Sequence, residues 1–245
     1  MEFTVKSYSY LVNSLKNKYK SFYSLFQFLT YKKIINVNNL VILRHDVDRK
    51  PENSSEMAKI ENALGIRGTY YFRIVRESFD VDIIKKIADL GHEIGYHYED
   101  VDLTIKNYKL KTKNEEDRER LIDLAYESFC ENLEEMRKVA DIKTICMHGS
   151  PRSKYDNKII WEKYNYKDLG IIGEPYFDID FNEFAYFTDT GRRWNGHKFS
   201  VRDKVNSKYN FDFKTTQQII DNIDKLPPKI MFTIHPERWT NSLFP

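Results

Sequence analysis

Residues 40–48 read LVILRHDVD, an apolar run that ends in a cluster of charged and polar side chains. The same order recurs along the chain: a short apolar run, then chemically capable residues, then a helical pattern. Runs of this length are typical of buried strands. We expect seven strands, within residues 40–43, 69–75, 93–98, 142–147, 169–172, 184–188 and 230–234.

Amphipathic helices are expected between these strands. Their patterns cover 54–64 with Asn53 as the cap, 80–90 with Asp80 at the start, 115–139, and 215–226. Alternating strands and helices predict a mostly parallel sheet, and about seven such units predict a barrel-like α/β fold. In that architecture the active site lies where the strands end.

Composition is typical of a globular protein, because 41% of the 245 residues are hydrophobic and 15% are aromatic. No linker or internal repeat is evident, so we expect a single domain over residues 1–245. Residues 1–39 are expected to form flanking helices with only a packing role. The charged stretch 109–120 is interpreted as a solvated loop and a first helical turn. The alternative is a mobile loop over the site.

Charge, cysteine content and the N-terminal pattern limit the partners and the compartment. Lys and Arg number 39 and Asp and Glu 37, and these charges are interspersed, so nucleic acid is not expected as a partner. The two cysteines form no disulfide framework. We expect a cytoplasmic protein, because no secretory pattern or transmembrane segment is evident. A nucleotide-linked or lipid-linked sugar precursor would suit that location.

Strand alternation sorts the polar residues of the first run by face, because side chains two apart share a face. Asp46 and Asp48 point together, and His45 points the other way. Two carboxylates on one face are costly unless a cation lies beside them. The structural alternative is that both aspartates cap the next helix or pair with Arg44 and Arg49.

Histidines end or flank the later runs. His97 shares a face with Glu99 if its strand continues, and His92 lies on the opposite face. His148 and His235 are each the last residue of an apolar run. Three histidines and two aspartates are therefore expected at one end of the sheet. For His45, His92 and His197 a packing role is the preferred interpretation.

This set of side chains has the chemistry of a metal-dependent hydrolase. Oxygen and imidazole ligands without thiolate suit Zn²⁺ or a similar divalent cation, and a catalytic site needs about three protein ligands. A spare carboxylate can accept a proton from water, and a histidine across the site can protonate the leaving group.

The motifs resemble those of the polysaccharide deacetylases with NodB homology, carbohydrate esterase family 4, in a branch whose first motif reads RHDVD. The resemblance runs from about Leu40 to Trp239. It implies a distorted (β/α) barrel with about seven parallel strands, Asp46 as the catalytic base and Asp48 as a metal ligand. GHEIGYH at 91–97 implies His97 as a second ligand, and TIHPERW at 233–239 implies His235 as the general acid.

Two departures from the family pattern leave the third metal ligand open. The family usually has a further histidine four residues after the second motif, but Val101 stands there. We expect His148 as the third ligand, with Glu99 as the second choice. The first motif also separates its aspartates by Val47, where the commoner family form has adjacent aspartates.

The resemblance also implies residues that bind the substrate. HGSPR at 148–152 occupies the place of the family's Arg-Pro turn, so Arg152 is expected to line the groove. DTGRRW at 189–194 resembles an Asp-Trp pair that supports the catalytic side. Asp189 is therefore expected at the substrate. Arg192, Arg193 and Trp194 are interpreted as lining a sugar groove by stacking and hydrogen bonds, and the alternative for these three is a surface loop anchored by one tryptophan.

The predicted function is metal-dependent removal of an acetyl group from an N-acetylated or O-acetylated sugar, with zinc as the first choice of metal. One alternative is a catalytically inactive glycan-binding or scaffold protein on the same fold. Another is an amidohydrolase acting on a small amide. An open groove rimmed by Trp194 and Trp239 would favour a glycan, and a small closed pocket would favour the amide.

Overall fold

The computed structural model of the protein describes residues 2–32, 38–195, 198, 200–202 and 204–240. Its centre is a seven-stranded sheet in which every pairing is parallel. The strands are β1 (Ser21–Tyr23), β2 (Leu40–Val47), β3 (Thr69–Phe72), β4 (Glu93–Tyr98), β5 (Ile145–Met147), β6 (Ala185–Thr188) and β7 (Lys229–Ile234). Their order is β5-β4-β3-β2-β7-β6, and β1 pairs with the first half of β2.

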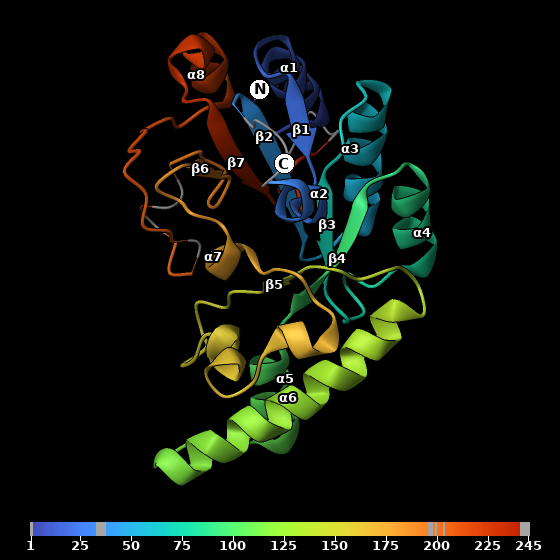
Figure 1. Ribbon diagram of the computed structural model, residues 1–245, viewed down its shortest axis with the longest axis vertical. Coiled ribbons are helices and arrows are strands. Elements are labelled where there is room, and N and C mark those ends of the chain that lie inside the picture. Colours follow the sequence, from blue (N-terminus) through green and yellow to red (C-terminus); the bar gives the residue numbers. More distant parts are fainter. Residues whose placement is uncertain (1, 33–37, 196–197, 199, 203, 241–245) are drawn as a thin grey trace.

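The predicted parallel α/β architecture is confirmed, as a distorted and incomplete (β/α) barrel (Figure 1). Within the described part of the chain, the pairing path ends at β5 on one side and at β6 on the other. Two 3₁₀ helices and the short helix α7 follow β5 before the chain enters β6. These elements span Asn157–Glu162, Tyr166–Leu169 and Pro175–Asp178.

Within the residues that the structure describes, seven longer helices surround the sheet. They are α1 (Val5–Lys18), α2 (Leu25–Tyr31), α3 (Pro51–Ala63), α4 (Val81–Asp89), α5 (Asp100–Tyr108), α6 (Glu115–Arg137) and α8 (Thr216–Asp221). Asp80 caps α4 as predicted, because its side chain accepts a hydrogen bond from the Ile83 N–H. Further 3₁₀ turns cover Ile223–Lys225 and Pro236–Arg238. Residues 109–114 join α5 to α6 and are mostly exposed, as expected of a solvated loop.

The expected cap of α3 is wrong. The helix begins at Pro51, whose fixed φ suits the first helical turn, and Lys50 is the capping residue. Asn53 lies inside the helix, and its amide donates hydrogen bonds to the carbonyl oxygens of Pro236 and Trp239. Asn53 therefore ties α3 to the segment that follows β7.

Two expectations about strands are also corrected. Residues 169–172 form no strand, because Gly170, at φ +73°, ends a 3₁₀ helix and Pro175 starts α7. Only Gly173 bridges to Thr144 there. The seventh strand is β1, which lies in the segment expected to be helical. Residues 1–39 thus contribute a strand to the sheet as well as helices.

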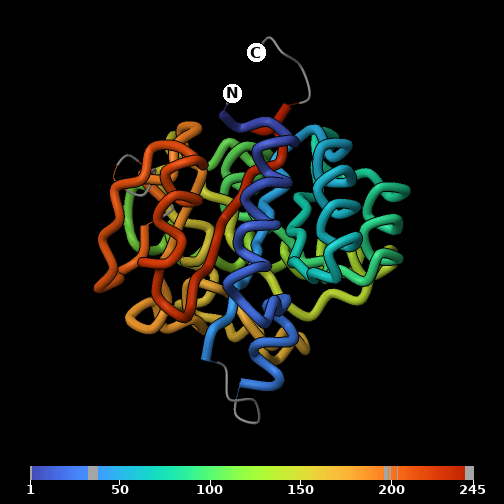
Figure 2. Tube along the Cα trace, turned by 90° about the horizontal axis from the view of Figure 1, so that it is seen from above, coloured from blue at the N-terminus to red at the C-terminus, as the bar shows by residue number. Residues whose placement is uncertain are grey.

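Helix α1 packs against both α3 and α8 (Figure 2). Its buried face carries Tyr8, Leu11, Val12 and Leu15. These side chains belong to the same core cluster as Val41 and other outward-facing residues of the sheet. No helix among the described residues combines the length and apolar character that a membrane span requires.

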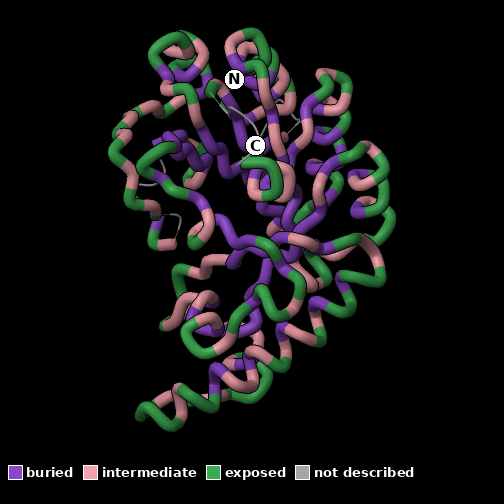
Figure 3. Tube along the Cα trace, in the orientation of Figure 1, coloured by how far each residue is buried: buried purple, intermediate pink, exposed green. Residues whose placement is uncertain are grey.

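Strand β2 is buried along its whole length, as Figure 3 shows for the centre of the sheet. Val41 and Leu43 face the helices, whereas Leu40 and Ile42 belong to a separate cluster on the inner face. That inner cluster is apolar at the start of the strands. Continuing the alternation places Arg44, Asp46 and Asp48 on the inner face at the other end. The inner face of the sheet is therefore apolar at the start of the strands and charged at their carboxyl ends.

Candidate metal and catalytic site

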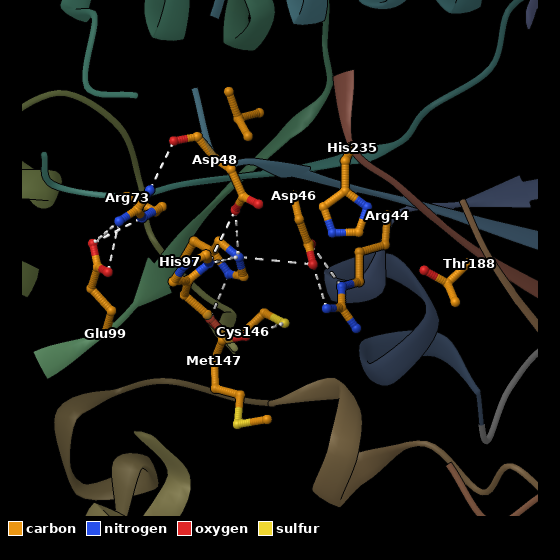
Figure 4. Close-up of polar contacts among 12 residues, drawn as sticks. Arg44, Asp46, Asp48, Arg73, His97, Glu99, Cys146, Met147, Thr188 and His235 are labelled. Atoms are coloured by element: carbon orange, nitrogen blue, oxygen red, sulfur yellow. Dashed lines mark hydrogen bonds and ion pairs between the residues drawn. The ribbon is translucent and has the colours of Figure 1, made fainter. Parts of the chain in front are cut away.

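Asp48, His97 and His148 meet at the carboxyl ends of β2, β4 and β5. His97 Nε2 lies 3.4 Å from Asp48 Oδ1, and His148 Nδ1 lies 3.1 Å from the same oxygen. The two imidazole nitrogens are 3.3 Å apart. Figure 4 shows Asp48 and His97 pointing toward one another, with Asp46 and His235 beside them. The structure thus brings together the three residues that the sequence analysis placed around a metal.

The backbone orients both imidazoles. His97 Nδ1 lies 2.9 Å from the carbonyl oxygen of Cys146 and donates its proton there, which leaves Nε2 facing Asp48. The His148 N–H donates to the Tyr98 carbonyl oxygen, and the Asn157 amide donates to the His148 carbonyl oxygen. The ring of His97 is therefore held through Nδ1, and the main chain of His148 is fixed on both sides of its side chain.

The Asp48 carboxylate fits a cation ligand. Burial alone would raise its pKa, but His148 and His97 hold the pKa of Asp48 well below its usual range. Its buried Oδ1 nevertheless accepts no hydrogen bond of good geometry from any described residue. A carboxylate oxygen and two imidazole nitrogens all lie within 4.8 Å of one another. This donor set suits Zn²⁺ or a similar divalent cation and leaves a coordination position open.

Asp46, His97 and the buried Cys146 form a second, overlapping group with metal-ligand atoms. Asp46 in this group is already bound by the guanidinium of Arg44. Arg44 Nε donates to Asp46 Oδ1 over 2.8 Å, and Nη2 donates to Oδ2 over 2.5 Å. The group is wholly buried, whereas Asp48 and His148 are partly exposed. A catalytic metal needs access to water and substrate, so the group with Asp48 suits that role better.

Arg44 sets the state of Asp46. Burial would raise the pKa of Asp46, but the charges of Arg44 and His97 lower it to about 2. The carboxylate is therefore ionised at neutral pH and fixed in direction by two hydrogen bonds. An ion pair between Asp46 and Arg44 was one of the structural alternatives to a catalytic role for Asp46. It coexists with the site, because Asp46 Oδ2 also lies 3.9 Å from His97 Nε2.

His235 lies across the site on a fixed carboxylate. Its Nδ1 is 2.6 Å from Asp189 Oδ1, and its backbone N–H donates to Asp189 Oδ2. Burial and Arg238 lower the pKa of His235, but Asp189 and Asp48 raise it further, to about 9. His235 is accordingly a cation at neutral pH when no metal is present. This is the protonation state that a general acid requires.

Asp189 does not reach the substrate side, which differs from the expected role. It is fully buried and also accepts hydrogen bonds from Arg238 Nη1 and Trp239 Nε1. The expected Asp-Trp pair exists, but its tryptophan is Trp239 and not Trp194. Motif TIHPERW, which begins with the last two residues of β7, therefore carries His235 and the two further side chains, Arg238 and Trp239, that bind Asp189.

The expected substrate-binding residues do not line the site. Trp194 is 0% exposed, and its indole donates to Thr216 Oγ1, so it has no face free for a sugar. Arg193 donates to Asn195 Oδ1. Arg152 is exposed on the turn beyond the site. Core packing thus holds Trp194 away from the strand ends and a local contact engages Arg193, whereas contact of Arg152 with a substrate stays a prediction.

Arg202 occupies the position that was expected for Arg152. Its side chain lies over Gly149 and contacts the Ser150 carbonyl oxygen and Asp156. It lines a pocket of about 230 Å³ together with Asp46, Asp48, His97, His148, His235 and Arg238. Nothing in the local sequence around Arg202 indicated this role, because the contact joins segments about fifty residues apart.

The remaining predicted residues lie outside this pocket. Glu99 follows the end of β4, and Arg73 donates to its two carboxylate oxygens over 2.8 and 2.7 Å. His45 and His92 lie on the opposite face of the sheet, near Glu61, in agreement with a packing role. His197 lies outside the described residues.

The raised pKa of His235 predicts a pH-dependent stability. Its unfolded pKa is about 6.5 and its folded pKa about 9, so the stabilisation is complete below pH 6.5 and is lost as the pH rises through 9. Between pH 6.5 and pH 9, we expect the free energy of unfolding of the chelator-treated wild type to fall by about 3 kcal/mol more than the free energy of unfolding of the chelator-treated His235→Gln variant. Urea denaturation at several pH values measures it, and parallel pH curves for the two proteins would contradict the assignment.

No family model matches the sequence, and no curated protein matches it. The structure is similar to the crystal structure of a mutant CE4 family pseudoenzyme with restored enzymatic activity. The two share 15% sequence identity and a TM-score of 0.40 over 81% of this chain and 57% of that chain. The chain thus spans a little more than half the length of that protein.

Proposed function

We propose that the protein is a metal-dependent hydrolase of the polysaccharide deacetylase type, and that it removes an acetyl group from a small acetylated sugar. One observation carries the proposal. A metal-ligand triad, an ionised carboxylate and a protonated imidazole all border one pocket of about 230 Å³. The three kinds of group match the needs of acyl-group hydrolysis.

The ligands proposed for the metal are Asp48, His97 and His148, and zinc is the first choice. A divalent cation there supplies positive charge that polarises a carbonyl oxygen and acidifies water. Glu99 is not proposed as a metal ligand, because Arg73 already binds both of its carboxylate oxygens.

Asp46 and His235 are proposed to move the protons. Asp46 is ionised and held by Arg44, so it is ready to orient the attacking water and to accept its proton. His235 carries a proton at neutral pH and lies at the other side of the same pocket. It would donate that proton to the departing nitrogen or oxygen atom of the sugar.

A small substrate is favoured over a long polymer. Trp194 and Trp239, which would have rimmed an open glycan groove, are both 0% exposed. The pocket volume of about 230 Å³ lies below the roughly 300–1,000 Å³ that is usual for small-molecule sites. The same observation supports a second candidate, hydrolysis of a small amide that is not a sugar.

Asp46→Asn tests the mechanism. We expect acetate release from N-acetylated amino sugars by the metal-loaded protein to fall by about 10²–10⁴-fold, because the amide cannot accept the proton from water. Metal content should stay that of the wild type, since Asp48, His97 and His148 are intact. Equal acetate release by the variant and the wild type would remove Asp46 from the mechanism. Acetate release from simple amides but not from sugars would favour the second candidate.

A further inference from the structure

A second pocket opens beside the candidate metal site and is lined by four arginines. It has a volume of about 400 Å³ and shares Asp48, His148 and Arg238 with the pocket described above. The other arginines are Arg49, Arg73 and Arg192. A substrate bound at the metal could therefore extend directly into this space.

Two of these arginines already have carboxylate partners. Arg73 binds both oxygens of Glu99. Arg238 donates to Asp189 and lies 3.7 Å from Glu237, which is the second acidic residue of the pocket after Asp48. The charge of Asp48 faces His97 and His148. Asp48 and Glu237 thus each lie beside an imidazole or a cation other than Arg49 and Arg192, and Glu237 Oε2 accepts no hydrogen bond from a described residue.

Arg49 and Arg192 are different. Both are exposed, and neither forms a hydrogen bond or an ion pair through its side chain with any residue that the structure describes. Arg49 directly follows Asp48 in the chain. The backbone N–H of Arg192 donates to the carbonyl oxygen of Asp189. This hydrogen bond fixes the start of the loop that carries Arg192 next to Asp189, whose carboxylate binds His235. Two cations without a counter-ion therefore border a pocket that opens on the reaction centre.

We propose that the substrate carries a phosphoryl group, and that Arg49 and Arg192 bind it in this second pocket while the acetyl group occupies the first. The inference rests on the proposed function. Guanidinium groups present paired N–H donors that match phosphate oxygens. A pocket of about 400 Å³ accommodates a phosphorylated sugar unit. A phosphate monoester and a nucleoside diphosphate share this chemistry.

Binding by isothermal titration calorimetry tests the proposal without depending on turnover. The full chain with Asp46→Asn, loaded with zinc, is titrated with N-acetylglucosamine, with its 1-phosphate and with its uridine diphosphate ester. We expect the two phosphorylated ligands to bind at least about tenfold more tightly than the neutral sugar, and we expect added salt to reduce that difference. Tighter binding of the uridine diphosphate ester than of the monoester would identify a nucleoside diphosphate as the source of the phosphoryl group, and equal binding would identify a monoester.

Variants test whether the preference for phosphorylated ligands comes from the two arginines or from the metal. Arg49→Gln combined with Arg192→Gln should remove the preference for phosphorylated ligands, and Arg120→Gln, which changes an exposed arginine of α6 outside both pockets, should retain it. The preference should also persist in chelator-treated protein, because it does not arise from the metal. Equal affinity for neutral and phosphorylated sugar, or a preference that survives the double substitution, would overturn the proposal. Failure of acetate release with the preference intact would count against the proposed function alone.

Discussion

Asp48→Asn is expected to abolish stoichiometric zinc binding and to lower acetate release by at least about 10³-fold. An amide carries no negative charge to compensate a divalent cation, and it is a poor substitute for a carboxylate ligand. The change also removes the only acidic member of the triad. Zinc content after dialysis and zinc affinity by competition with a chromophoric chelator measure the first effect, and acetate release measures the second.

A matched control and a pair of variants make this prediction specific. Asp89→Asn changes an exposed aspartate at the end of α4 and should leave zinc content and acetate release unchanged. His148→Gln should weaken zinc binding at least about 100-fold, whereas Glu99→Gln should leave it within a few-fold of wild type. Retention of full zinc affinity by Asp48→Asn would refute the site. The opposite order for His148 and Glu99 would reassign the third ligand.

Asp189→Asn is expected to cost about 3–5 kcal/mol of stability and to lower acetate release by about 10³-fold or more. Asp189 is 0% exposed and accepts hydrogen bonds from His235, Arg238 and Trp239. Removing its charge leaves two buried or partly buried cations without their shared partner. Asparagine keeps only one acceptor oxygen, so it cannot accept from the His235 ring on one side and from the His235 backbone N–H and Trp239 Nε1 on the other, and the direction of the His235 ring is no longer fixed.

Two measurements distinguish positioning from simple destabilisation. The pKa of His235, followed by NMR in chelator-treated protein, should fall from about 9 in Asp189→Asn, because Asp189 is a main cause of its elevation. In metal-loaded protein at a temperature where the variant is folded, kcat should fall far more than KM changes. An unchanged pKa of His235, or an effect confined to KM, would show that Asp189 does not position the acid.

Much of the site could be predicted from periodicity. The apolar runs defined six of the seven strands, and the two-residue repeat of a strand placed Asp46 and Asp48 on one face and His45 on the other. The ends of parallel strands lie at the same edge of a sheet, which is why His97 and His148 meet Asp48. Such inferences need only local spacing and the rule that strands alternate with helices.

Local spacing was insufficient where a contact depends on residues far apart in sequence. Strand β1 has only three residues, too few for a periodic signal, and it is held by its pairing with β2. Arg202 reaches the site by folding over Gly149, and Trp194 is drawn into the core against Phe3 and Trp239. These placements depend on which surfaces the packed elements present to one another.

The sequence by itself therefore determined the parallel α/β architecture and the set of strand ends that carry aspartate and histidine. The tertiary structure alone decided which partner each of these side chains has. Arg44 binds Asp46, and Arg73 binds Glu99. The tryptophan that contacts Asp189 is Trp239 and not Trp194. The physical reason is that strand alternation is a property of the backbone, whereas the pairing of long charged or aromatic side chains is settled by burial and hydrogen bonding in the folded protein.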